Sequence, residues 1–296
     1  MKPAAFDYVA PASLADALSV LSRYGDDAKV LAGGQSLVPM MALRLAAPAV
    51  LVDLNRAQGL AGIEVDEATM TVGAMTRHRD VLDHPELRWR CPMIPEAVAE
   101  IGHVSIRNRG TVGGSLAHAD PAAEWGALAL ALDAEIEAVG PAGERLIPAS
   151  ELFVTYFTSS LQPDEIIRRV RFRLPAGDRS GSAFVEVARQ HGDFALAGAA
   201  AWLTLDGDWI VADARVALIG VADVPIRSRL AEQALAGQRP TDAVIAQAAA
   251  SMDAEIRPPD DVHGSAKVRR MVARAVLERA LTRARARAEG ADADQT

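Results

Sequence analysis

Residues 29–41 read KVLAGGQSLVPMM, and this stretch constrains the fold more than any other part of the chain. Gly33 and Gly34 lack a Cβ, so the backbone can adopt a positive φ there and a ligand can approach the bare chain. Consecutive N–H groups in such a turn form an anion site, and a helix beginning near Ser36 adds its own free N–H groups. Pro39 suits the first turn of that helix. The stretch predicts a strand–turn–helix corner for a phosphate or pyrophosphate; an ordinary corner without a ligand is the alternative.

A second stretch, residues 107–124, reads RNRGTVGGSLAHADPAAE and again combines a hydroxyl residue, a double glycine and a serine. Two such turns, about eighty residues apart, predict two loops that bind one extended ligand from two sides. Neither turn matches GxGxxG or the GxxxxGK[ST] phosphate loop. The GxSxG elbow of hydrolases is also excluded, because Val38 stands where its second glycine would be.

Composition narrows the class of protein. The 296 residues are half hydrophobic, which suffices for two domains, and the net charge of −8 disfavours nucleic acid as the main partner. Cys91 is the single cysteine, which excludes an internal disulfide and a cysteine-ligated iron–sulfur cluster. The chain shows no secretory h-region and no run of about 20 apolar residues. We therefore expect a soluble cytoplasmic protein.

Hydrophobic periodicity and turn signals divide the chain into three parts. A helix at 13–24, with Ser13 as N-cap and Gly25 as its end, and strands at 29–32 and 50–54 form a first subdomain of residues 1–55. A second subdomain, 56–175, contains a helix capped by Thr76, a buried helix at 122–132, and strands at 62–65, 69–74, 135–139, 145–147 and 170–174. The alternating arginines of the last strand predict a solvated face.

The segment PAGD at 175–178 predicts a domain boundary. Beyond it, strands are expected at 184–189, 195–206 and 209–220, followed by helices near 228–235, 241–255 and 265–286. Strands followed by helices indicate an α+β domain, which we place at residues 178–284. The remaining residues, 285–296, are expected to form a disordered tail.

Side chains for metal or hydrolytic chemistry do not converge in the sequence. None of the six histidines belongs to an HExxH motif, and His118 with Asp120 lacks a third ligand. We therefore predict no metal site and no catalytic residue in this chain. Glu124 follows the second glycine turn and can accept hydrogen bonds from ligand hydroxyls such as those of a ribityl chain. A surface salt bridge is the alternative role for Glu124.

Taken together, KVLAGGQSLVPMMALRLA and IRNRGTVGGSLAHADPAAE resemble the FAD-binding medium subunits of molybdenum hydroxylases. This family includes the medium chain of aerobic carbon monoxide dehydrogenase and the flavin portion of xanthine dehydrogenase. The resemblance runs from about residue 3 to residue 284 and includes DVHGSAKVRRMVARAVLERAL. It implies a two-subdomain FAD-binding fold of the vanillyl-alcohol oxidase (PCMH) type over 1–175. The carbon monoxide dehydrogenase flavoprotein-type C-terminal domain, with a three-stranded antiparallel sheet and helices, would follow.

The resemblance also implies where FAD binds: extended between the domains and without a covalent tether. The first pyrophosphate loop corresponds to Ala32, Gly33, Gly34, Gln35, Ser36 and Leu37, and the second to Thr111, Gly113, Gly114 and Ser115. Glu124 corresponds to a carboxylate that contacts the flavin chain, Ile166 or Ile167 to an apolar stretch near the isoalloxazine, and Phe194 to a ring-side position. Family members often carry His or Thr at position 35 and Asn at position 115. Carbon monoxide dehydrogenase has a tyrosine at position 194, so the phenol hydroxyl is missing here.

The function implied by the resemblance is electron transfer within a larger enzyme. A large molybdenum-cofactor subunit and a small subunit with [2Fe–2S] clusters would be the partners, in a dimer of heterotrimers. FAD would receive electrons from the clusters and pass them to an external acceptor. Two alternatives stay open: a stand-alone flavin oxidoreductase of the same fold, and a nucleotide-binding or scaffold protein without a redox role.

Overall fold

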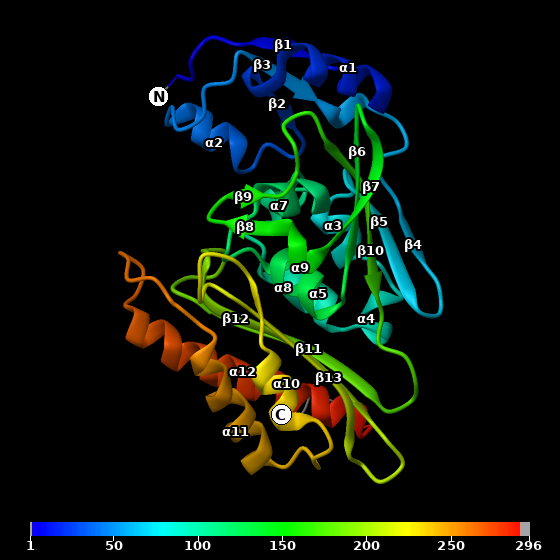
Figure 1. Cartoon of the computed structure of the whole chain (residues 1–296), viewed down its shortest axis with the longest axis vertical. Coiled ribbons are helices and arrows are strands. Elements are labelled where there is room, and N and C mark those ends of the chain that lie inside the picture. Colours follow the sequence, from blue (N-terminus) through cyan, green and yellow to red (C-terminus); the bar gives the residue numbers. More distant parts are fainter. Residues whose placement is uncertain (1, 291–296) are drawn as a thin grey trace.

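The computed structural model describes residues 2–290, which form three tiers along the long axis of the molecule (Figure 1). In the first tier, strands β1 (Asp7–Val9), β3 (Val50–Asp53) and β2 (Ala28–Leu31) pair in parallel in that order, with helix α1 (Leu14–Tyr24) packed on them. The predicted helix ends are confirmed: Ser13 accepts a hydrogen bond from the Asp16 N–H (3.1 Å), and Gly25 ends the helix at φ 52°.

The middle tier contains an antiparallel sheet in the order β4-β5-β10-β6-β7. Its strands are β4 (Ile63–Val65), β5 (Thr69–Gly73), β6 (Glu135–Gly140), β7 (Gly143–Pro148) and β10 (Ile166–Arg173). The helices of this tier are α3 (His78–Leu82), α4 (Leu87–Arg90), α5 (Met93–Glu100), α6 (Val104–Arg107), α7 (Val112–His118), α8 (Glu124–Ala131) and α9 (Ala149–Leu152). A small hairpin, β8 (Phe153–Thr155) and β9 (Thr158–Ser159), lies beside α7.

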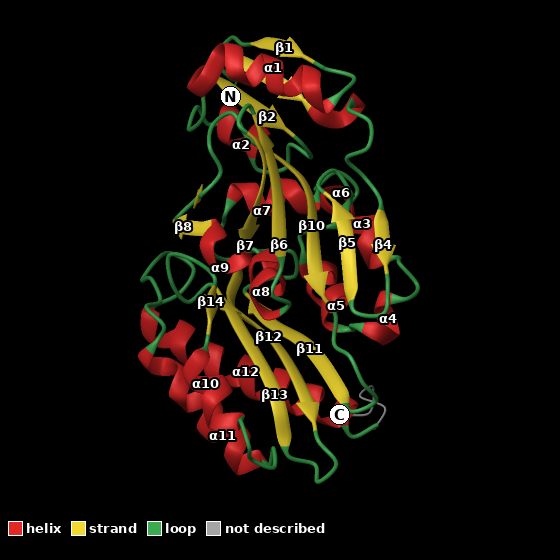
Figure 2. Ribbon diagram, turned by 45° about the vertical axis from the view of Figure 1, so that its right-hand side comes forward, coloured by secondary structure: helices red, strands yellow, loops and turns green. Residues whose placement is uncertain are grey.

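The third tier is the predicted α+β domain. Strands β11 (Ser180–Ala188), β12 (Ala195–Leu205) and β13 (Val211–Ile219) form the expected antiparallel sheet, and a short fourth strand, β14 (Ile226–Arg227), extends it. Helices α10 (Arg229–Leu235), α11 (Asp242–Ser251) and α12 (Ala266–Ala288) cover its outer face (Figure 2). Every residue of α8 is buried, because that helix lies between this sheet and the other helices of the middle tier.

Several local predictions were wrong. Thr76 does not cap a helix, since its hydroxyl bonds to the N–H and C=O of Gly62 and Arg77 is the N-cap of α3. Residues 285–288 of the predicted tail are helical, because Ala284 and Ala288 are buried against β11. The tail prediction for residues 291–296 lies outside the described residues. By contrast, the predicted solvated face of β10 is confirmed, because Arg171 and Arg173 are exposed, and Arg171 also pairs with Glu135 of β6.

Partly buried hydrogen bonds join the middle tier to the third tier. The Glu96 carboxylate on α5 accepts from Arg287 of α12 (2.5 Å) and from the Phe184 N–H of β11 (2.8 Å), and Arg287 also donates to the Ser182 carbonyl (2.6 Å). These bonds hold β11 and α12 of the C-terminal domain against helix α5 of the middle tier. Over residues 2–290, none of the helices is both long and apolar enough to cross a membrane.

Candidate functional site

The first glycine turn has the predicted strand–turn–helix form. Strand β2 ends at Leu31, Gly34 takes a φ of 74°, and Ser36 is the N-cap of helix α2 (Leu37–Ala42) without using its side chain as a cap. Within the described residues, none of the backbone N–H groups from Gly33 to Leu37 donates to an acceptor of the chain. Five consecutive N–H groups that have no acceptor within residues 2–290, at a helix start, are suited to an anion.

The second glycine motif differs from the expected turn, because it is the first turn of helix α7. The Thr111 hydroxyl caps that helix by accepting from the Gly114 N–H (3.1 Å). The N–H of Val112 donates to the Thr76 carbonyl (3.1 Å), and that of Gly113 donates to the Ala74 carbonyl (2.9 Å). These N–H groups are therefore already satisfied by the protein. For an anion, this segment offers the hydroxyls of Thr111 and Ser115.

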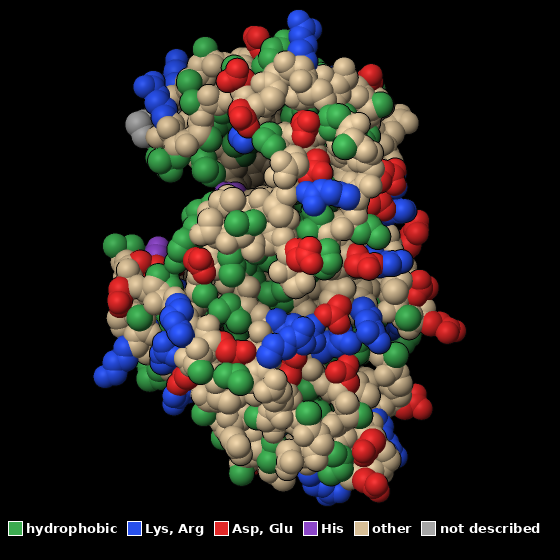
Figure 3. Space-filling model, viewed as in Figure 1, with side chains coloured by type: hydrophobic (Ala, Val, Ile, Leu, Met, Phe, Trp, Pro, Cys, Tyr) green, Lys and Arg blue, Asp and Glu red, His purple; other side chains and the backbone are tan. Residues whose placement is uncertain are grey.

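The two glycine motifs contact each other in the folded chain. A Cβ at Gly33 would lie 2.8 Å from the Gly110 Cα and 2.9 Å from the Arg109 carbonyl carbon, and closer still to the Arg109 oxygen. A Cβ at Gly114 would lie 3.3 Å from the Ala32 Cβ. The missing Cβ atoms thus permit contact between the loops, a reason that the sequence did not reveal. Figure 3 shows the surface hollowed on this side, between the first tier and the middle tier.

Glu124, at the start of α8, is 8% exposed and makes no salt bridge within residues 2–290. Burial raises the pKa of its carboxyl to about 8, and the nearby carboxylates of Asp120 and Glu100 add to the rise. Burial, together with Glu124 and Glu100, raises the pKa of Glu186 on β11 to about 9. The alternative of a surface salt bridge for Glu124 is therefore wrong, and at neutral pH its protonated carboxyl can both donate and accept hydrogen bonds.

The remaining predicted residues lie on segments that border the glycine motifs. Ile167 is buried at a β-bulge near the start of β10. The Ala74 N–H donates to the Arg168 carbonyl on that strand (3.0 Å). Ala74 also packs on Gly113 and so connects β10 to α7. Phe194 is 68% exposed in the loop between β11 and β12. The tip of that loop, at Gly192, packs on His103 just before the second motif.

Sequence reasoning missed several residues of this region. Glu186 belongs to β11 and approaches Glu124 only in the folded chain, so no local pattern signals it. Asn55 and Arg77 donate to carbonyls of the two glycine motifs. Asn55 was open to prediction, since it follows a strand parallel to β2 and the carboxyl ends of parallel strands share one edge of a sheet. Arg77 gave no such signal.

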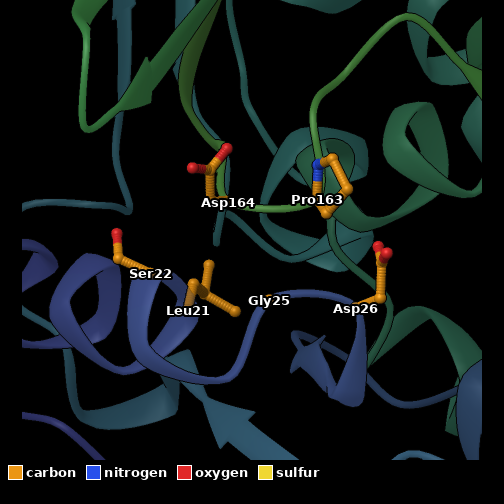
Figure 4. A pocket seen from close by; sticks show the side chains of 6 residues that line it. All are labelled: Leu21, Ser22, Gly25, Asp26, Pro163 and Asp164. Atoms are coloured by element: carbon orange, nitrogen blue, oxygen red, sulfur yellow. The ribbon is translucent and has the colours of Figure 1, made fainter.

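A separate open pocket of about 200 Å³ lies elsewhere, between the end of α1 and the loop before β10 (Figure 4). Asp26 and Asp164 border it, together with Leu21, Ser22, Gly25 and Pro163. None of these residues belongs to the glycine motifs. The pocket is therefore distinct from the predicted cofactor site.

Comparisons with known proteins cover nearly the whole chain. The family described as an FAD binding domain in molybdopterin dehydrogenase matches residues 4–176, and that described as a CO dehydrogenase flavoprotein C-terminal domain matches residues 182–284. Subunit alpha of the 6-hydroxypseudooxynicotine dehydrogenase complex of Paenarthrobacter nicotinovorans is 45% identical over 289 residues, 97% of each chain. The carbon monoxide dehydrogenase medium chain of Hydrogenophaga pseudoflava is 37% identical over 97% of this chain and 99% of its own.

Solved structures show the same fold. A carbon monoxide dehydrogenase structure from Hydrogenophaga pseudoflava matches with a TM-score of 0.93 at 37% identity, over 97% of this chain and 99% of the other. Quinoline 2-oxidoreductase from Pseudomonas putida 86 matches with a TM-score of 0.90 at 36% identity, over 98% of this chain and 99% of the other. The fold and length of the chain are thus shared with subunits of larger oxidoreductases.

Proposed function

The chain belongs to the family of FAD-binding medium subunits of molybdenum hydroxylases, and we propose that it carries electrons from a partner's [2Fe–2S] clusters through one non-covalent FAD to an external acceptor. The observation that carries this proposal is the run of free N–H groups at Gly33–Leu37, directly beside the second glycine motif. We place the boundary between the FAD-binding and C-terminal domains at residues 175–178.

The residues present fit FAD. The N–H groups from Gly33 to Leu37 would bind the pyrophosphate, and the hydroxyls of Thr111 and Ser115 would complete its hydrogen bonds. The contacts of Gly33 with Gly110 and of Gly114 with Ala32 keep the two motifs close enough for one ligand, and Gly113 packs on Ala74. When bound, the isoalloxazine supplies the ability to exchange electrons either singly or in pairs. The chain itself supplies binding, orientation and local charge.

Glu124 is suited to the ribityl hydroxyls, because its carboxyl is protonated at neutral pH and can serve as donor or acceptor. The buried Ile167 would border the ring, and the exposed Phe194 would shield it. Covalent attachment through cysteine has no support: Cys91 is fully buried, and burial raises the pKa of its thiol to about 12.

We further propose that the partners are a large molybdenum-cofactor subunit and a small [2Fe–2S] subunit, in a cytoplasmic dimer of heterotrimers. A single cysteine cannot ligate a cluster, so the electron donor must be another chain. Exposed apolar side chains on α2 and after it, Val38 (50%), Leu43 (57%) and Leu45 (73%), support a protein contact beside the glycine motifs.

The test is purification of the native complex, with its subunits identified and its FAD, molybdenum and iron measured. We expect about one FAD per copy of this chain, released by acid precipitation, and metals only with the partner chains. A native assembly of this chain alone, oxidising a substrate without molybdenum, would establish the stand-alone oxidoreductase instead. A native complex without flavin would refute the proposal.

A further inference from the structure

The free N–H groups of the first glycine turn depend on how its carbonyl oxygens are held. The N–H and C=O of one planar trans peptide point in opposite directions, so a donor that anchors a carbonyl also orients the next N–H. The Asn55 amide Nδ2 donates to the Ala32 carbonyl (3.0 Å), which orients the Gly33 N–H. The Gln35 amide Nε2 donates to the Gly33 carbonyl (2.9 Å), which orients the Gly34 N–H.

The second glycine motif is held by the same network. The Arg77 guanidinium donates through Nη1 to the Arg109 carbonyl and through Nη2 to Oδ1 of Asn55. The Arg77 side chain thus connects the carbonyl of Arg109, in the second motif, with Asn55, the residue that anchors the first motif. The Arg109 carbonyl is also the group on which Gly33 packs.

Hydrogen bonds to Asp53 hold Asn55 in place. The Asp53 carboxylate accepts from the backbone N–H of Asn55 (2.8 Å), from its side-chain amide and from the Tyr8 hydroxyl. These bonds leave the Asn55 amide one orientation, with Nδ2 toward Ala32 and Oδ1 toward Arg77. The network spans the first and middle tiers only where the glycine motifs meet, which is where an anion-binding loop needs its peptides fixed.

We propose that Asn55 and Arg77 are positioning residues for the dinucleotide, a role that rests on the proposed function. They touch carbonyl oxygens on the protein side of the loops, so that the N–H groups of Gly33 and its neighbours face the pyrophosphate. Without these two side chains, the Ala32–Gly33 peptide can rotate, and the two motifs are no longer held in a fixed position relative to each other. The anion then meets carbonyl oxygens or water in place of fixed donors.

The experiment compares FAD and ADP binding by the full chain after flavin removal, for Asn55→Leu, Arg77→Met and the double variant. Both nucleotides carry the pyrophosphate, so each single variant should weaken both at least tenfold. The double variant should lose less than the product of the single losses, because both act on one network. Arg77→Lys, which keeps the charge and can reach one acceptor, should recover part of the affinity.

Arg145→Met is the matched control. Arg145 also donates to a side chain, Glu165 (2.6 Å), and to a backbone carbonyl, that of Ser160 (2.8 Å), but at the hairpin of β7. It should change FAD affinity less than twofold while costing similar thermal stability of the flavin-free chain. Equal losses in Arg145→Met and Arg77→Met would show a general effect on stability and overturn the inference.

Unchanged FAD affinity in Asn55→Leu or Arg77→Met would also overturn it. Should Arg77→Met fail to fold, Asn55→Leu and Arg77→Lys decide the question by the same measurement. Failure of the wild-type chain to bind FAD is a different result: it would refute the proposed function itself.

Discussion

Replacement of Gly33 by alanine tests the contact between the two glycine motifs most directly. The added Cβ would lie 2.8 Å from the Gly110 Cα and 2.9 Å from the Arg109 carbonyl carbon. Non-bonded carbons are most favourable at about 3.5–4.0 Å, so the loops must separate by roughly 0.7 Å or more. The opposing atoms are all backbone, and no side-chain rotation can relieve the overlap.

Overpacking of this kind costs about 1–3 kcal/mol, which sets the expected loss of stability for Gly33→Ala. A larger effect is expected on FAD, because its pyrophosphate would need donors from the first loop and hydroxyls from the second at once. A hydrogen bond to a charged group such as the pyrophosphate contributes about 1.5–3 kcal/mol, so displacement of one donor can remove that much binding free energy. We therefore expect FAD affinity to fall between tenfold and a hundredfold.

The assay is titration of the flavin-free chain with FAD, followed by flavin fluorescence, with urea unfolding measured in parallel. Gly207→Ala is the control, because a Cβ there would meet nothing nearer than the Arg179 Nη1 at 3.9 Å. Wild-type FAD affinity in a folded Gly33→Ala chain would refute the reasoning. An equal loss in Gly207→Ala would refute it as well, since the effect would then be unrelated to the loops.

Two further predictions concern the neighbouring residues. The folded-state pKa of Glu124, about 8, lies above its ordinary value of 4.5, so its stabilising contribution is complete below pH 4.5 and is lost as pH rises through 8. Glu124→Gln should therefore stabilise the flavin-free chain at pH 8 by at least about 1 kcal/mol and flatten its pH dependence in urea unfolding; parallel pH curves for variant and wild type would contradict this. Thr111→Val should cost about 1 kcal/mol by removing a helix cap and should also weaken FAD binding, whereas Thr241→Val, which removes the cap of α11, should cost similar stability and leave FAD binding unchanged.

The fold was largely predictable because its signals are local. Ser13 and Gly25 mark the ends of α1 through hydrogen bonds within a few residues, and the alternation on β10 is visible in the sequence. Prediction failed where the local structure depends on a residue far away in the sequence. Thr76 looks like a helix cap, yet Gly62 takes its hydroxyl, and Ala288 continues α12 because β11 lies beneath it.

The local structure of the candidate site was predictable only in part. The corner at Gly33–Ser36 follows from bare backbone beside a helix start, and the structure contains it. The second motif has nearly the same residue types, but there Thr111 caps a helix. The first N–H groups of that helix donate to acceptors within the protein. What separates the two cases is the carbonyl of Ala74, which accepts from the Gly113 N–H. Ala74 lies in the turn after β5, far from residue 113 in the sequence, so no local pattern near residue 113 signals this acceptor.

From the contact between the two motifs we expect cofactor binding to be coupled to docking of the first tier on the middle tier. The first tier contacts the second motif through Gly33, and Asn55 and Arg77 bridge the same junction, so a chain with the tiers apart has neither the loop contact nor the fixed donors. A ligand that binds only the docked form stabilises that form by RT ln(1 + [L]/Kd), about 2.7 kcal/mol at a hundredfold excess over Kd. Loss of flavin should therefore loosen the first tier before the α8 core, and a substitution that weakens the junction should lower the apparent FAD affinity in proportion to the docked fraction of the flavin-free chain.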